Sequence, residues 1–217
     1  YYLLHQLQNF FSPLNVFRYI TFRSALAVIT SFSVSIILGP WLIRKLAHFK
    51  IGQQVRKEES DALYDLHRHK QWTPTMGGIL ILFSVLLSVL FWADLSNQYI
   101  LLTILTCIWL GALGFVDDYI KITQKKSKGL NAREKLLWQF GLGIIIGLFI
   151  YLDPATTTKL DVPFFKDAAM DIGLFYVPLV ILIIIGTSNA VNLTDGLDGL
   201  AIGSVLLVAF TLSILSY

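Results

Sequence analysis

Two adjacent carboxylates, Asp117 and Asp118, follow the apolar stretch Tyr99–Val116, and six Lys or Arg residues come within the next seventeen positions. Ionised carboxylates are costly beside a bilayer unless they lie at the water boundary and meet a cation. A carboxylate pair next to a basic loop suits a divalent cation and phosphorylated substrates. It equally suits acidic residues that only end a membrane span, and this stretch alone does not decide between the two interpretations.

A second polar motif, Asn192–Gly199, contains two Asp-Gly pairs three residues apart. Asp-Gly pairs favour turns, so the motif is open to a purely structural interpretation. The backbone at such a turn also approaches a ligand closely, since glycine has no side chain. A third polar motif, His69–Gly78, precedes another apolar stretch. The three motifs are the candidate functional segments.

The composition places these motifs in a membrane protein. The chain has 217 residues, of which 55% are hydrophobic and 14% charged, whereas soluble domains have about 25% charged residues. Its single cysteine, Cys107, excludes an internal disulfide. Six apolar runs approach the ~20 residues that cross a bilayer and predict an all-α, polytopic helical bundle. The predicted spans are Phe22–Ile43, Thr75–Trp92, Tyr99–Val116, Leu136–Leu152, Gly173–Val191 and a sixth from Leu200 onward.

The Lys and Arg residues predict the orientation of the spans. Seven follow the first span and six follow the third, but none follows the second and two follow the fourth. By the positive-inside rule, the loops 44–74, 117–135 and 192–199 face the cytoplasm and the N-terminus lies outside. All three polar motifs then converge on one face. We expect a single membrane domain over residues 1–217, incomplete at its C-terminus, with an interfacial segment at 1–20.

Three local patterns predict details of the spans. Thr73, followed by proline, predicts the N-cap of the second span. Pro178 predicts a kink in the fifth span. Gly143 and Gly147 form a GxxxG pattern in the fourth span, which is more often close packing within one bundle than a dimer interface.

The motifs together resemble one known family. In order along the chain, the matching segments are Lys70 with Thr73–Gly78, Gly114–Tyr119, Lys128–Leu130, Val162–Asp167 and Gly186–Ala201. On these segments the chain resembles the N-terminal part of the phospho-N-acetylmuramoyl-pentapeptide transferase family, and the resemblance covers essentially all 217 residues. The form of the Asn192–Gly199 motif points to this branch rather than to the N-acetylglucosamine-phosphate branch.

The resemblance implies a Mg²⁺-dependent enzyme of the bacterial cytoplasmic (inner) membrane, with its active site on the cytoplasmic face. The implied substrates are UDP-N-acetylmuramoyl-pentapeptide and undecaprenyl phosphate, and the implied products are lipid I and UMP. The expected partners are these substrates and the lipid bilayer, and no nucleic acid is expected. Whether the protein forms a homodimer is left open.

The resemblance also implies roles for individual residues. Asp117 would deprotonate the lipid phosphate, and Asp118 would support it, with Mg²⁺ held by both. The other matched positions would bind the substrates. Lys70, Gly196, Leu197 and Asp198 would bind the uridine. Thr75, Asn192 and Asp195 would reach the ribose and the pyrophosphate, and Lys121, Lys125 and Arg133 would bind phosphate. Asn189 is a further expected substrate-binding residue. A third family carboxylate and a His-rich loop would lie beyond Tyr217, so we expect the 217 residues alone to be inactive.

Two other functions fit parts of the pattern. An ion-coupled transporter also places carboxylates in membrane helices, but it predicts them near the middle of the bilayer rather than at span ends. A polyprenyl-phosphate N-acetylglucosamine-1-phosphate transferase would share the fold and differ in the sugar. A nucleotide-exchange assay with each UDP-sugar separates the three functions.

Overall fold

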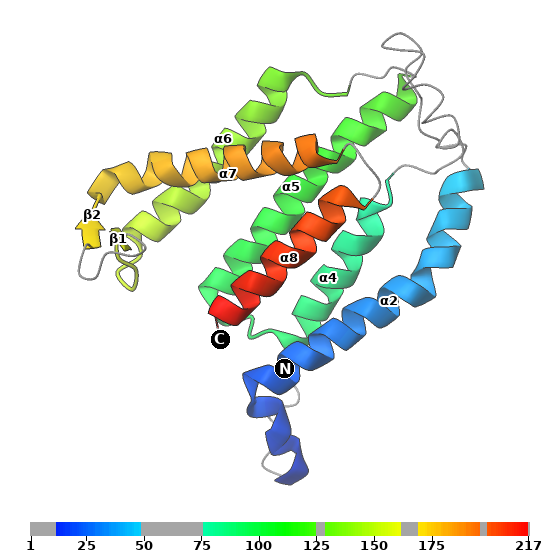
Figure 1. Ribbon diagram of the computed structural model, residues 1–217, viewed down its shortest axis with the longest axis horizontal. Coiled ribbons are helices and arrows are strands. Elements are labelled where there is room, and N and C mark those ends of the chain that lie inside the picture. Colours follow the sequence, from blue (N-terminus) through cyan, green and yellow to red (C-terminus); the bar gives the residue numbers. More distant parts are fainter. Residues whose placement is uncertain (1–11, 49–75, 125–128, 162–168, 196–198, 217) are drawn as a thin grey trace. The chain divides into compact units, whose positions relative to one another are not determined.

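The computed structural model describes residues 12–48, 76–124, 129–161, 169–195 and 199–216. The chain forms two compact units, Tyr1–Asn131 and Ala132–Tyr217, here called the N-terminal and the C-terminal unit. Each unit is described by itself (Figure 1). A single membrane domain over residues 1–217 stays a prediction.

The described residues of the N-terminal unit form one 3-10 helix and three α-helices. They are η1 (Ser12–Arg18), α2 (Ile20–His48), α4 (Gly78–Trp92) and α5 (Gln98–Thr123). Helix α4 lies beside both α2 and α5 (Figure 1). Figure 1 also shows that α2 bends in its second half, where Pro40 lies inside the helix. Proline removes a backbone hydrogen bond and clashes with the preceding turn, which accounts for the bend.

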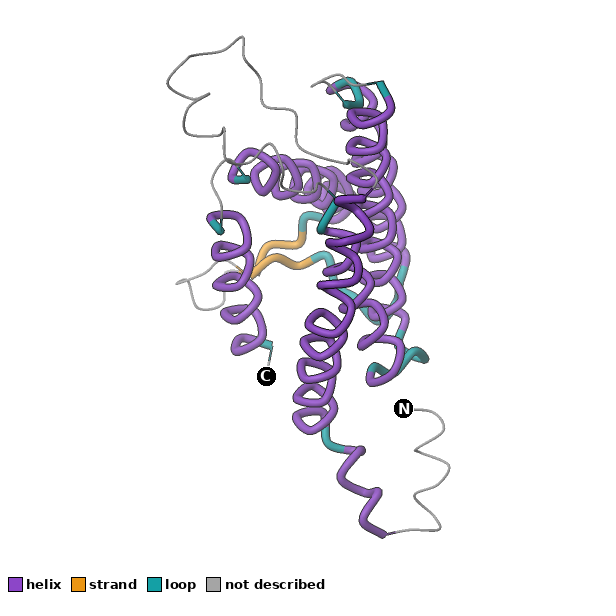
Figure 2. Tube along the Cα trace, turned by 90° about the vertical axis from the view of Figure 1, so that its right-hand side faces the viewer, coloured by secondary structure: helices purple, strands orange, loops and turns teal. Residues whose placement is uncertain are grey.

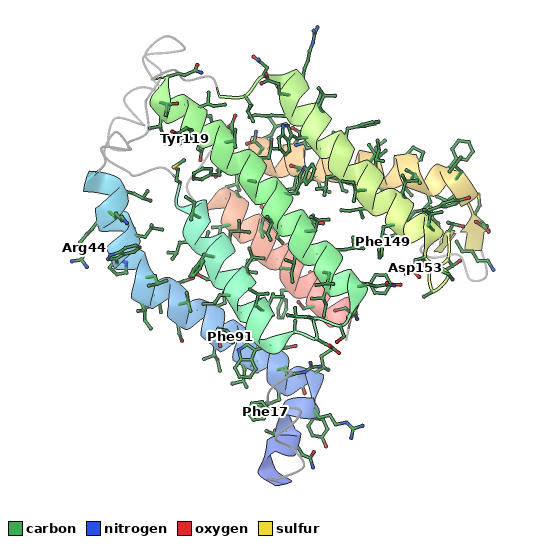
Figure 3. The ribbon with its side chains drawn as sticks, turned by 180° about the vertical axis from the view of Figure 1, so that it is seen from behind. Phe17, Arg44, Phe91, Tyr119, Phe149 and Asp153 are labelled. Carbon is green, nitrogen blue, oxygen red and sulfur yellow. The ribbon has the colours of Figure 1, made fainter. Side chains whose placement is uncertain are left out.

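Neighbouring helices of the N-terminal unit run antiparallel. Trp92 Nε1 donates a hydrogen bond to Thr30 Oγ1 at 2.9 Å, and Ser35 Oγ donates to Ser84 Oγ at 2.9 Å. Ser84 is fully buried, so this bond satisfies a hydroxyl inside the α2–α4 contact. Figure 3 shows the result: Arg44 and Tyr119 lie toward one end of the unit, and Phe17 and Phe91 toward the other.

In the C-terminal unit, the part of the chain that the structure describes forms three α-helices, a 3-10 turn and a two-stranded hairpin. They are α6 (Ala132–Leu152), β1 (Lys159–Asp161), β2 (Ala169–Asp171), η3 (Gly173–Phe175), α7 (Tyr176–Thr194) and α8 (Leu200–Leu215). The two strands pair antiparallel, with Lys159 opposite Asp171 (Figure 2). The hairpin connects the end of α6 to the start of α7, so these two helices also run antiparallel.

Gly143 and Gly147 bring α6 and α7 into close contact. A Cβ atom at position 143 would lie 2.8 Å from Ile181 Cα, and one at position 147 would lie 3.2 Å from Val177 Cα. Glycine allows two helix backbones to approach closely, and at position 143 a Cβ atom would clash with the partner backbone. The GxxxG pattern therefore packs within the bundle, as the sequence predicts.

The predicted membrane class is confirmed: the chain is an all-α, multi-pass membrane protein. Among the described residues, four helices are long and apolar enough to span a bilayer, and the two shorter apolar helices are Gly78–Trp92 and Leu200–Leu215. Large apolar side chains are exposed along the helices, for example Ile37 at 72% and Leu182 at 68%. Lipid contact explains such surfaces, which a soluble monomer seldom exposes.

Helices in the structure do not end where the predicted spans end. Helix α2 continues through Arg44 and Lys45, and α5 continues beyond Val116 to Thr123, so parts of the predicted cytoplasmic segments 44–74 and 117–135 are helical. That these segments face the cytoplasm stays a prediction. Helix α4 begins at Gly78 with Gly77 as its N-cap, and Thr73, the predicted N-cap, lies outside the described residues. Met76, with φ of 72°, lies in the left-handed region, which a continuing right-handed helix does not allow.

The sequence predicts a kink at Pro178. Helix α7 begins at Tyr176, which places Pro178 in the first turn rather than inside the helix. Backbone N–H groups of the first turn have no partner within the helix, so a proline there removes no helical hydrogen bond. The three-residue strands were not predicted, because segments of that length carry too little periodicity.

One carboxylate, that of Asp171 at the end of β2, bonds to both the residue before β1 and the start of η3. Asp171 Oδ1 accepts hydrogen bonds from Thr158 Oγ1 at 2.5 Å and from the backbone N–H of Gly173 at 3.0 Å. The Thr158 bond, and then the Gly173 bond, lower the pKa of Asp171 below its usual value. The ionised carboxylate therefore stabilises the hairpin above the usual pKa, and this contribution is lost as the pH falls through the lowered value.

Gly143→Ala is expected to destabilise the protein, because the new methyl group would press on the backbone of α7. We expect a loss of about 1–3 kcal/mol, measured as a lower thermal midpoint in detergent. Gly141→Ala is the matched control, since no atom lies within 4 Å of a Cβ at that position. An equal loss in both variants would show that the close α6–α7 contact does not matter for stability.

Candidate active site

The carboxylate pair lies within the last two turns of α5 rather than after the helix. Asp117 is buried, with 6% of its surface exposed. The side chain of Asp118 is 39% exposed. Adjacent residues on a helix point in different directions, about 100° apart. One carboxylate is therefore turned into the protein and the other toward its surface.

Lys121 bridges the two carboxylates. Its Nζ lies 2.6 Å from Asp117 Oδ2 and 3.0 Å from Asp118 Oδ1. The spacings of four and three residues place all three side chains on one stretch of helix surface. The ammonium offsets part of the negative charge, which explains why the helix can continue past two ionised residues.

A backbone segment closes over Asp117 from the other side. The N–H of Leu130 donates to Asp117 Oδ1 at 2.8 Å. The neighbouring Gly129 lies so close that a Cβ atom there would be 2.7 Å from Asp117 Cγ and 2.7 Å from the Asp117 carbonyl oxygen. Glycine at this position lets the chain fold against the carboxylate and bury it. Each Asp117 oxygen thus has a defined donor.

Two carboxylates suit a magnesium ion. Mg²⁺ prefers oxygen ligands and is commonly held by one or two carboxylates together with substrate phosphates and water. Asp117 and Asp118 offer such oxygens within one helical turn. Within residues 12–48, 76–124, 129–161, 169–195 and 199–216, no group of three or more His, Cys, Asp or Glu gathers. The two carboxylates could supply two oxygen ligands of a Mg²⁺ ion, and Mg²⁺ binding itself stays a prediction.

The C-terminal end of α7 carries three further predicted side chains. Asn192 and Asp195 are exposed, and their spacing places them on the same face of the helix end. Asn189 is half-buried. Its Nδ2 donates to Gln139 Oε1 at 2.8 Å and to the Ile185 carbonyl at 2.8 Å. Asn189 is thus tied to α6, whereas Asn192 and Asp195 are accessible.

Arg133 lies at the same end of the C-terminal unit as these residues. It is exposed in the first turn of α6, and α6 and α7 run antiparallel. The start of α6 is therefore at the same end of the unit as Asn192 and Asp195. That the loops 117–135 and 192–199 converge on one face of the membrane stays a prediction.

Three helix ends of the N-terminal unit lie at the same end of that unit. Helix α2 ends at His48, α4 begins at Gly78 and α5 ends at Thr123, and neighbouring helices are antiparallel. Asp117 and Asp118 come just before Tyr119 in α5, and Figure 3 shows Tyr119 toward the same end of the unit as Arg44. The carboxylates are therefore near the end of the unit where α2 ends and α4 begins.

Comparison with known proteins decides the family. The model of glycosyl transferase family 4 matches residues 98–217, which is more than half of the chain. The chain belongs to glycosyl transferase family 4. The carboxylate pair, Arg133 and the α7 end all lie inside the matched region. A shorter signature, described as phospho-N-acetylmuramoyl-pentapeptide-transferase signature 1, matches residues 70–82.

Curated relatives match the chain over its whole length. Three are the phospho-N-acetylmuramoyl-pentapeptide-transferases of Desulforapulum autotrophicum, Citrifermentans bemidjiense and Solidesulfovibrio magneticus. Each is 46% identical over all 217 residues of this chain. The matches cover 59%, 60% and 59% of the relatives' own lengths. The chain thus spans about three fifths of the relatives that it matches.

The structure places some of the predicted residues of this family 4 chain and leaves others outside the described residues. Those it describes are Asp117, Asp118, Lys121, Arg133, Asn189, Asn192 and Asp195. Those outside are Lys70, Thr75, Lys125, Gly196, Leu197 and Asp198. Among the described residues, Asp117, Asp118 and Lys121 are brought into direct contact. Their assigned roles in binding and catalysis stay predictions.

One residue of the site region was missed by sequence reasoning. Gln139 is 3% exposed in the middle of an otherwise apolar part of α6 and bonds to α7. A polar side chain inside a membrane span is costly and usually has a partner or a function. That isolated amide between Trp138 and Phe140 was the signal that could have identified it.

Proposed function

We propose that the protein containing this chain transfers phospho-N-acetylmuramoyl-pentapeptide from its UDP carrier to undecaprenyl phosphate. The products would be lipid I and UMP. The observation that carries this proposal is the buried Asp117, fixed between Lys121 and the Leu130 N–H inside the region matched by glycosyl transferase family 4. The relatives' printed names and the signature at residues 70–82 favour the muramoyl-pentapeptide substrate.

In the proposed reaction, Asp117 accepts the last proton of the lipid phosphate. The freed phosphate oxygen forms a bond to the phosphorus that carries the sugar. The bond from that phosphorus to the UMP oxygen breaks, and UMP leaves with the electron pair. Removing the proton increases the negative charge on the attacking oxygen, which is the general-base effect. A two-step path through a phosphoryl-enzyme would use the same carboxylate as nucleophile.

Lys121 connects substrate binding to the proton transfer. In the described structure its ammonium is held by both carboxylates. An arriving phosphate competes for the same ammonium, because it is also an anion. When Lys121 turns toward the phosphate, Asp117 Oδ2 becomes able to accept a proton. Lys121 would thus bind phosphate, as expected from the resemblance, after its ammonium leaves the two carboxylates.

Mg²⁺ is part of the proposal, held by Asp117 and Asp118 together with substrate phosphates. When bound, the ion offsets the charge of the pyrophosphate. The exposed carboxylate of Asp118 is accessible to such an ion, whereas Asp117 is buried. Both substrates are anionic, so the basic loop between α5 and α6 attracts them to the same place.

A nucleotide-exchange assay tests the proposed function. The full-length protein is incubated with undecaprenyl phosphate, Mg²⁺ and either UDP-N-acetylmuramoyl-pentapeptide or UDP-N-acetylglucosamine. We expect UMP release and a lipid-linked product only with the muramoyl-pentapeptide substrate. Product from the N-acetylglucosamine substrate instead would assign the other branch of the superfamily. Release with neither substrate would contradict transferase function.

The proposed active-site face of the membrane is cytoplasmic, which is the orientation that the Lys and Arg counts predict. Lys126→Cys and Lys159→Cys are introduced separately into a Cys107→Ala background, which removes the native thiol. In cells with a permeabilised outer membrane, an impermeant thiol reagent is expected to label position 159 only. Position 126 should react only after the inner membrane is opened. Labelling of both positions from the same side would contradict the predicted orientation.

A further inference from the structure

We propose that Gln139 is a positioning residue for the nucleotide substrate. It fixes the Asn189 carboxamide so that Asn189 Oδ1 is available as a hydrogen-bond acceptor beside Asn192 on the end of α7. This inference rests on the transferase function proposed above. It adds a residue of α6, which does not itself touch substrate, to the determinants of nucleotide binding.

The orientation of both amides follows from one backbone carbonyl. Asn189 bonds to the carbonyl oxygen of Ile185 at 2.8 Å. A carbonyl oxygen only accepts, so the Asn189 atom that faces it is Nδ2. The same Nδ2 lies 2.8 Å from Gln139, which must therefore present Oε1. The Gln139 Nε2 is then the donor to Ser188 Oγ at 3.1 Å. The chain of bonds admits one arrangement.

This arrangement leaves the Asn189 oxygen for a ligand. Both hydrogen bonds of Asn189 are made by Nδ2, and Oδ1 has no hydrogen-bond partner among the described residues. Were Asn189 to turn over, its nitrogen would face outward and the site would present a donor instead of an acceptor. Gln139 Oε1 prevents the turn, since an oxygen facing another oxygen would be left without a donor.

The close packing of α6 against α7 makes Gln139 an effective support. Gly143 lies one turn further along α6 and admits the Ile181 backbone. The two helices therefore have no freedom to separate at this level, and the Gln139 amide, which is 3% exposed, has no solvent to bond with instead. A buried, fully bonded polar network is rigid because each lost bond leaves a desolvated group.

The fixed oxygen belongs to a row of acceptors at the end of α7. Asn189 and Asn192 are three residues apart, as are Asn192 and Asp195, so their side chains follow one another along the helix surface. A row of oxygen acceptors suits the N–H of a uracil ring and the hydroxyl groups of a ribose. The structure thus assigns to Gln139 an indirect part in recognising a nucleoside diphosphate sugar.

The test uses the full-length enzyme and compares four variants: Gln139→Met, Ser188→Ala, Asn189→Ala and the double variant Gln139→Met with Asn189→Ala. Gln139→Met keeps the side-chain volume and removes both bonds. We expect it to raise the KM for the UDP-substrate about tenfold, with kcat within about threefold and the KM for undecaprenyl phosphate unchanged. Ser188→Ala removes only the other bond of Gln139, and we expect its KM to stay within about twofold of the parent.

The double variant separates positioning from general destabilisation. If Gln139 acts through Asn189, adding Gln139→Met to Asn189→Ala should raise the KM no further. A parent-like KM in Gln139→Met, or an independent second rise in the double variant, would overturn the proposal. Gln139→Glu, which can still accept from Asn189 Nδ2, should recover most of the affinity lost in Gln139→Met. Failure of both Gln139 variants to fold would also overturn it, because the network would then serve folding alone.

The outcome for Gln139 is distinct from the outcome for the proposed function. If the parent enzyme releases no UMP from either UDP-sugar, the transferase proposal fails. If the parent is active and Gln139→Met binds the UDP-substrate as the parent does, only the inference about Gln139 fails.

Discussion

Asp117→Asn in the full-length protein is expected to lower kcat at least about 100-fold, which is the lower range of general-base effects. The amide has nearly the same shape, and its oxygen can still accept the Leu130 N–H. It cannot take a proton, and it carries no charge to hold Lys121 at 2.6 Å. The loss should therefore be chemical rather than steric.

Binding of the UDP-substrate is expected to survive in this variant. Its affinity should change by less than about tenfold, roughly 1.4 kcal/mol, because the predicted uridine contacts come from other residues. Calorimetry measures the binding, and UMP release measures the turnover. Asp198→Asn, at a predicted uridine contact outside the described residues, should weaken binding more than turnover. If Asp117→Asn turns over near the parent rate, Asp117 is not the base and only holds charge at the helix end.

Gly129→Ala is expected to have the second largest effect, although the glycine carries no functional group. The new methyl carbon would lie 2.7 Å from both Asp117 Cγ and the Asp117 carbonyl oxygen. Such a contact cannot persist, so either the carboxylate or the 129–130 segment must move. A displacement of about 1 Å in a reacting group can cost 10²-fold in rate. We expect kcat to fall about 10-fold to 100-fold.

The control for this variant is Gly203→Ala in α8, where no atom lies within 4 Å of a Cβ. Both proteins should reach the membrane in similar amounts, and UMP release compares their turnover. Parent-like turnover in Gly129→Ala would show that Asp117 does not need the segment that closes over it. A similar fall in Gly203→Ala would show that the effect is not specific to Asp117.

The helices of this fold could be predicted because the bilayer leaves few alternatives. A long apolar run that spans lipid must satisfy its backbone internally, and a helix does so. The polar ends were harder to predict. The sequence suggested that the third span stops at Asp117, but charges three and four residues apart stabilise one another on a helix. Lys121 accordingly lets α5 continue to Thr123.

The site was only partly predictable for a different reason. Residue types identified Asp117 and Asp118 as candidates, since adjacent carboxylates are conspicuous beside an apolar run. Which of the two is buried depends on the Leu130 N–H and on the space left by Gly129. Gln139 depends in the same way on a neighbour about fifty residues away in sequence, Asn189. Contacts of that kind come from tertiary packing, and no local pattern reports them.

The glycine contact between α6 and α7 limits how the length of this chain can vary. Each inserted residue advances a helix by about 1.5 Å and turns it by about 100°. One residue added between Gln139 and Gly143 would turn Gln139 away from α7 while the glycines stayed in place. A residue added between β1 and β2 would leave α6 and α7 in register. Insertions and deletions among relatives should therefore accumulate at the hairpin and be absent from residues 139–147.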